Sequence, residues 1–149
     1  MNFIIDTREQ KPLKLKKAVS KCLTVGDYSV EDFEDDIAYE RKSVSDLYKC
    51  LGRSDIKRFK SQLLRLSKIK HRGLLIESTW TSVGWGFLYS PLPGAVAQQK
   101  LIELVTKYDI PVYFVQGRDE AVSLLTSLMS AAYKDVQKCR IQKKKKKKQ

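Results

Sequence analysis

Short apolar runs and helically spaced apolar residues divide the chain into predicted strands and helices. Compact apolar runs bounded by polar or turn-forming residues predict strands. Apolar residues that recur every three or four positions predict helices with one buried face. The predicted strands lie at 3–5, 73–77 and 111–115, with a hairpin over 25–42, and the predicted helices lie at 43–51, 55–70, 95–108 and 119–138.

Helix and strand alternate through the second half of the chain, which predicts parallel strands there. The hairpin in the first half predicts antiparallel strands. We therefore expect an α/β fold with a mixed central sheet, antiparallel at the front and parallel at the back, flanked by helices. The segment 78–94 lacks a clear period and is predicted to be a long loop.

The strand Ile37–Lys42 carries the most informative pattern. Side chains of a strand alternate between two faces, so Glu40 and Lys42 share one face, with only Ala38 before them. Arg41 is on the other face and is expected to anchor neighbouring acids, either Glu9 or Asp46, while Asp46 also fits a helix cap.

A hairpin centred between Phe33 and Glu34 would place Asp27 directly opposite Glu40. Opposed side chains lie about 5 Å apart, and like charges there are destabilising. A divalent cation relieves this repulsion, and carboxylate oxygens suit Mg²⁺ or Mn²⁺. We expect Asp27 and Glu40 to bind the metal, with Asp6 as a further ligand or as support for the ligands.

The charge balance of the chain indicates a polyanionic partner. The net charge is +12, from 29 basic and 17 acidic residues. Six lysines, Lys143–Lys148, belong to a basic end segment, so the remaining body is still near +6. We expect a domain at 1–138 and a disordered tail at 139–149, because like charges repel. The tail could hold DNA, direct nuclear import or be an artificial extension.

The cysteines and the single histidine exclude several classes of site. Cys22, Cys50 and Cys139 are odd in number and unpaired in spacing, which indicates reduced thiols in an intracellular protein, nuclear or cytoplasmic. No signal peptide or membrane-spanning run is expected. Because His71 is the only histidine, a Ser-His-Asp triad and a histidine-rich metal site are excluded.

Basic residues on and near the second helix are candidates for binding phosphates, although a solvated helix face explains them equally well. The DNA-binding candidates are Arg8, Arg53, Lys57, Arg58, Lys60 and Arg65. Aromatic residues in the 78–94 loop could stack on unpaired bases, but packing on the core or on a partner is the preferred interpretation.

Four separated motifs occur together in order. They are Ile4-Ile5-Asp6-Thr7-Arg8-Glu9, Gly26-Asp27-Tyr28, Glu40-Arg41-Lys42 and Ser43-Val44-Ser45-Asp46. Together they resemble the signature of XPF-type structure-specific endonucleases, which belong to the restriction-endonuclease-like superfamily. The resemblance implies a nuclease domain whose catalytic set is Asp6, Glu9, Asp27, Glu40, Arg41, Lys42 and Asp46.

The resemblance also implies an activity and an assembly. Such domains cleave DNA near branches or single-strand/double-strand junctions, and they act in pairs. The usual tandem helix-hairpin-helix module has no counterpart after Lys138, so branch selectivity needs another source. The alternative is a non-catalytic DNA-binding subunit, but such subunits lose the acids or the lysine.

Apolar residues on more than one face of helices 95–108 and 119–138 predict burial on two sides. A twofold homodimer, or a paired nuclease subunit, would supply the second cover. The alternative is a monomer in which the loop 79–89 folds over these helices.

Overall fold

Six strands form one mixed sheet in the computed structural model, which describes residues 1–147. The order across the sheet is β2-β1-β3-β4-β5-β6. Strand β3 runs antiparallel to β1 and β4, whereas β1–β2, β4–β5 and β5–β6 are parallel pairs. The bounds are β1 Phe3–Asp6, β2 Ala18–Lys21, β3 Tyr28–Val30, β4 Ile37–Ser43, β5 His71–Glu77 and β6 Val112–Phe114. The predicted mixed α/β fold is confirmed.

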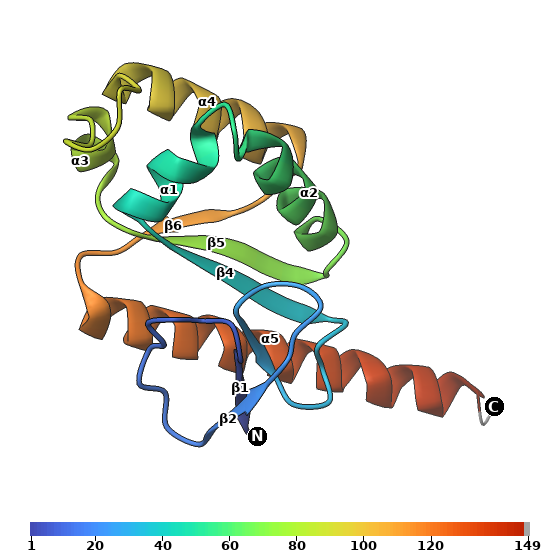
Figure 1. Cartoon of the computed structure of the whole chain (residues 1–149). Coiled ribbons are helices and arrows are strands. Elements are labelled where there is room, and N and C mark those ends of the chain that lie inside the picture. The colour runs from blue at the N-terminus through green and yellow to red at the C-terminus, as the bar shows by residue number, and fades with distance from the viewer. Residues whose placement is uncertain (148–149) are drawn as a thin grey trace.

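Helices cover both faces of the sheet (Figure 1). Four helices lie over one face, and the long helix α5 crosses the other. The bounds are α1 Val44–Leu51, α2 Ile56–Leu66, α3 Trp80–Gly84, α4 Gly94–Lys107 and α5 Arg118–Lys147. No helix within residues 1–147 combines the length and the apolar character needed to span a bilayer.

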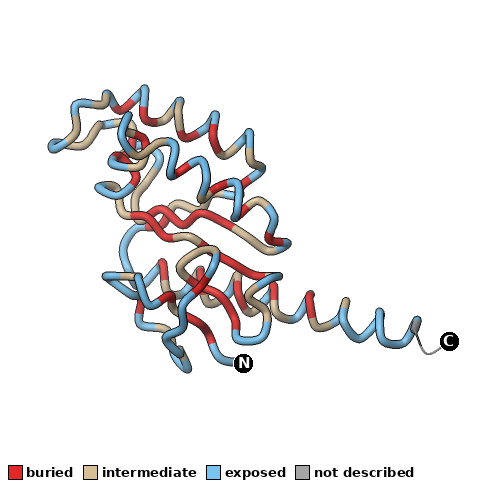
Figure 2. Tube along the Cα trace, turned by 45° about the vertical axis from the view of Figure 1, so that its right-hand side comes forward, coloured by how far each residue is buried: buried red, intermediate tan, exposed pale blue. Residues whose placement is uncertain are grey.

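Alternation along the central strands builds a separate apolar core on each face, as the buried positions in Figure 2 show. Ala38, Leu74 and Ile76 pack with α1, α2 and α4. Tyr39 and Leu75 pack with α5 on the other side. Glu40 and Lys42 follow Ala38 in the pleat and so face α1 and α2, whereas Arg41 lies on the α5 side.

Helix α1 has the boundaries that the sequence predicts. Ser43 is its N-cap, and its hydroxyl accepts a hydrogen bond from the Asp46 N–H at 3.1 Å. Gly52 is the C-cap. The cap fixes the direction in which the chain leaves β4, directly after the residues of the candidate site.

Two short elements were not predicted. Strand β2 pairs with β1 at the sheet edge, and its mostly exposed residues give no apolar alternation to detect. Helix α3 lies inside the predicted loop, where the Thr79 side chain caps it. In the aromatic segment after α3, Phe87 packs against the buried Tyr48, whereas Trp85, Leu88 and Tyr89 stay at the surface and are 79%, 88% and 84% exposed.

Helix α5 continues to Lys147, whereas the lysine-rich sequence predicts a disordered tail from residue 139. Arg140 still contacts the body through Asp36 Oδ2, at 2.9 Å. Lysine is a good helix former, and extending a helix requires no new nucleus, so the helix persists beyond its last contact. The expected domain boundary at residue 138 stays a prediction, and residues 148–149 lie outside the described part.

Candidate active site

The hairpin of β3 and β4 has the predicted register. Tyr28 pairs with Tyr39, so Asp27 lies opposite Glu40. The Asp27 N–H donates to the Tyr39 carbonyl at 2.8 Å. Gly26 precedes them with φ +76°, and a Cβ there would lie 3.0 Å from the Tyr39 oxygen. Glycine therefore allows the close approach that brings Asp27 to the strand.

The two opposed carboxylates disfavour double ionisation. Burial and then repulsion from Glu40 raise the pKa of Asp27 to about 7, although the Arg41 N–H donates to Asp27 Oδ2 at 2.9 Å. A nearby cation would stabilise the ionised form of such a carboxylate and lower its raised pKa.

Lys42 supplies one positive charge at this point. Its ammonium donates to Glu40 Oε1 at 3.0 Å and lies 5.3 Å from the centre of the Phe59 ring. Burial is the largest single influence and lowers the pKa of Lys42, but Glu40, Cys50 and Asp27 together outweigh it and raise that pKa. Lys42 therefore stays protonated and can stabilise an anion.

The opposite face of β4 is held by a buried ion cluster around Arg41. Arg41 donates to both oxygens of Glu9, at 2.8 and 3.0 Å, and to Glu77 at 3.1 Å. Its side chain is 5% exposed. Of the two anchors considered from the sequence, the structure shows Glu9. Arg118, the first residue of α5, approaches Glu77 to 3.6 Å.

Asp6 lines the same cavity as the opposed pair, but its carboxylate is already engaged. Oδ2 accepts from Arg8 Nε at 2.8 Å, and Oδ1 accepts from the Leu23 N–H at 2.9 Å. This geometry suits support of the site better than direct ligation. Asp46 Oδ2 accepts from the hydroxyl of the N-cap residue Ser43 at 2.8 Å, so Asp46 supports the cap of α1 while lining a wider groove that reaches Lys42.

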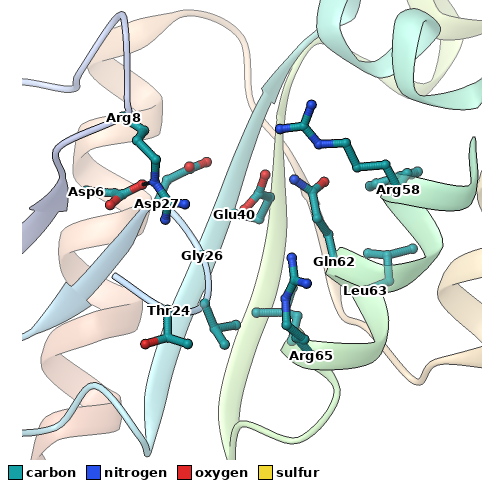
Figure 3. A pocket seen from close by; sticks show the side chains of 13 residues that line it. Asp6, Arg8, Thr24, Gly26, Asp27, Glu40, Arg58, Gln62, Leu63 and Arg65 are labelled. Atoms are coloured by element: carbon teal, nitrogen blue, oxygen red, sulfur yellow. Dashed lines mark hydrogen bonds and ion pairs between the residues drawn. The ribbon is translucent and has the colours of Figure 1, made fainter. Parts of the chain in front are cut away.

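A cavity of about 220 Å³ lies between the hairpin and α2 (Figure 3). Its walls carry Asp27 and Glu40 on one side and residues of α2 on the other. Of the six DNA-binding candidates, Arg8, Arg58 and Arg65 line this cavity. The other three, Arg53, Lys57 and Lys60, are exposed and do not line it.

The residues fit a divalent cation held chiefly by two carboxylates. Asp27 and Glu40 offer hard oxygen donors at an open cavity, and a bound cation would relieve the repulsion between their carboxylates. Within the described residues, no cluster of three or more acidic, cysteine or histidine side chains gathers around one point. Phosphate oxygens and water would therefore have to complete the coordination.

Three residues at the site were not identified from the sequence. Gln62 lines the cavity between Arg58 and Arg65, and spacings of four and three residues along one helix are the signal that places them together. Glu77 and Arg118 reach the Arg41 cluster through the parallel β4–β5 register and the start of α5. Such long-range pairing leaves no local signal.

Comparisons with known proteins identify the family and the fold of the chain. The family model described as "ERCC4 domain" matches residues 5–128. No curated protein matches the chain.

Two solved structures share the fold. XPF from Aeropyrum pernix has a TM-score of 0.69 and 20% identity, over 89% of this chain and 61% of that one. XPF from Aeropyrum pernix in complex with DNA has a TM-score of 0.67 and 21% identity, over 90% of this chain and 66% of that one. The chain thus spans less than two thirds of each. Because the family model matches well over half of this chain, the chain belongs to the ERCC4 domain family of XPF-type nucleases.

Proposed function

We propose that this protein is a metal-dependent endonuclease that hydrolyses phosphodiester bonds in DNA, with Mg²⁺ or Mn²⁺ as its cofactor. The observation that carries the proposal is the grouping of Asp27, Glu40 and Lys42 on one face of the hairpin, beside a cavity lined with arginines. The complete set of acids and lysine supports a catalytic domain over a non-catalytic subunit.

Asp27 and Glu40 would hold the cation, which when bound polarises the phosphoryl oxygen and lowers the pKa of water. Lys42 would orient that water and stabilise the charge that grows on the phosphate. The Arg41 cluster fixes β4 from behind, so Glu40 and Lys42 keep their positions. The positive charge of Lys42 and the nearby arginines attracts the DNA backbone.

The substrate within this class is branched DNA, or DNA with a single-strand/double-strand junction, in repair, recombination or replication. Membership of the ERCC4 family and the fold shared with an XPF that was solved in complex with DNA support this part of the proposal. The same relationship supports action as a homodimer or with a paired nuclease subunit.

The test uses labelled flap, fork and linear DNAs with and without Mg²⁺. We expect Asp27→Asn and Glu40→Gln each to lower the cleavage rate about 100-fold or more, because charge stabilisation in the transition state is lost, while DNA binding persists. Asp35→Asn removes the same charge from the exposed hairpin turn and serves as the control. Cleavage within threefold of wild type for either site variant would disprove the assignment.

A further inference from the structure

Three residues of α2 form a stripe along the catalytic cavity. Arg58, Gln62 and Arg65 are spaced four and three residues apart, so they share one side of the helix. All three line the cavity that contains Asp27 and Glu40. Figure 3 shows their side chains extending from α2 toward the space in front of Glu40.

The polar ends of this stripe are not used by the fold. Arg8, Arg41, Arg72, Arg118 and Arg140 each pair with a carboxylate. Within residues 1–147, by contrast, no carboxylate lies within salt-bridge distance of Arg58 or Arg65, and the Gln62 side-chain amide makes no hydrogen bond. An arginine paired inside the protein has a structural role, whereas these cavity-lining cations are available to a ligand.

The back of α2 is rigidly anchored. Phe59, Leu63 and Leu66 are at most 2% exposed and pack in the core on this side of the sheet. Phe59 also contacts the Lys42 ammonium through its ring. The stripe is therefore held at a fixed position relative to the catalytic lysine, as a positioning surface requires.

The spacing of the stripe allows contact with separate phosphates of one DNA strand. Arg58 and Arg65 are seven residues apart, or about 10 Å along the helix at about 1.5 Å per residue. Arginine side chains at this separation can contact two different phosphates of one strand, with room for the scissile phosphate between them.

We infer that Arg58, Gln62 and Arg65 form a substrate-positioning wall. The two arginines hold the phosphates that flank the scissile one, and the Gln62 amide hydrogen-bonds the strand between them. This inference rests on the proposed nuclease function. It separates the basic residues of α2 into two groups, because Arg58 and Arg65 line the cavity whereas Lys57 and Lys60 do not and can only attract DNA in general.

The first experiment separates positioning from attraction by measuring single-turnover cleavage at saturating protein, together with the salt dependence of binding. We expect Arg58→Gln and Arg65→Gln to lower the saturating rate about 10- to 100-fold, because the scissile phosphate is misplaced. Lys57→Gln and Lys60→Gln should act through affinity and reduce the slope of log K against log salt by about one. Lys134→Gln, on the exposed side of α5, is the charge-matched control.

Gln62→Ala should lower the saturating rate while leaving the salt slope unchanged, because no charge is lost. Rates for Arg58→Gln and Arg65→Gln that recover fully at saturation, as expected for Lys57→Gln, would overturn the inference. A wild-type rate for Gln62→Ala would remove Gln62 from the wall.

A second measurement needs no cleavage and so distinguishes this inference from the proposed function. Neutral methylphosphonates placed one at a time along the labelled strand should weaken binding at two positions, one on each side of the scissile phosphate. Arg65→Gln should abolish the effect at one of them and Arg58→Gln at the other. If the wild-type protein shows this interference but does not cleave DNA, the wall is supported and the proposed nuclease function is disproved. Uniform interference along the strand would disprove the wall.

Discussion

At the scale of single residues, ionisation of Asp27 lowers the stability of the metal-free fold. Its pKa is raised from 3.8 to about 7, first by burial and then by repulsion from Glu40. The folded state thus binds the proton more tightly than the unfolded state, so stability falls as the pH rises from about 4 to about 7. Above pH 7 Asp27 is ionised and the loss of stability is complete.

This dependence of stability on pH predicts the behaviour of Asp27→Asn, which cannot ionise at this position. In EDTA at pH 8, Asp27→Asn should be more stable than wild type by about 1 kcal/mol, or about 2–4 °C in melting temperature. At pH 5 the gain should be smaller, because Asp27 of the wild type is then largely protonated. Thermal melts at the two pH values measure both. A lower melting temperature for the variant at pH 8 would show that the two carboxylates do not repel.

Substitution of Arg41 or Glu9 should have the opposite effect and lower the stability, because each side chain neutralises the charge of the other. Both side chains are at most 7% exposed, and removing one partner leaves a buried charge unpaired. Arg41→Gln or Glu9→Gln should destabilise the protein by about 3–5 kcal/mol in urea unfolding. Lys21→Gln is the comparison, since its side chain is 55% exposed and forms a surface ion pair with Glu34, so little loss of stability is expected. Equal losses for the three variants would contradict the buried pair.

At the scale of elements, local signals defined the hairpin and α1 well. The acidic turn set the hairpin register that opposes Asp27 and Glu40, and Ser43 with Gly52 marked the ends of α1. The sequence could not show β2, because an exposed edge strand has no buried face to impose alternation. Nor could it reveal the environment of Glu77, which depends on the pairing of β4 with β5 across some 35 residues.

The extension of α5 predicts where the lysine tail acts. Its last contacts, Arg140 to Asp36 and Asp135 to His71, lie at the starts of β4 and β5, whereas Lys42 lies near the end of β4. Deleting residues 143–149 should therefore reduce the salt slope of binding by about 0.9 per lost phosphate contact. The saturating cleavage rate should change little. An unchanged slope, measured by titration at several salt concentrations, would show that the tail does not touch DNA.

At the scale of the whole molecule, uncovered apolar surface supports the predicted dimer. Val96 and Ile102 of α4 are 41% and 44% exposed, and the neighbouring segment carries the exposed Trp85, Leu88 and Tyr89. We expect light scattering at micromolar concentration to give twice the mass of the chain, and Ile102→Ser to lower it. Ile141→Ser, which removes an exposed isoleucine far along α5, should not. A monomeric mass with Mg²⁺ and DNA present would exclude the homodimer.

Helix α5 follows all six strands of the sheet along the chain. Among the helices of residues 1–147, α5 alone covers its face of the sheet, and its first residue, Arg118, donates to the Lys11 and Pro12 carbonyls and approaches Glu77. A folding intermediate whose strands have paired before α5 docks therefore exposes Tyr39 and Leu75 to water. The hairpin that holds Asp27 and Glu40 gains its backing only when α5 docks, so completion of the proposed active site depends on the docking of this helix.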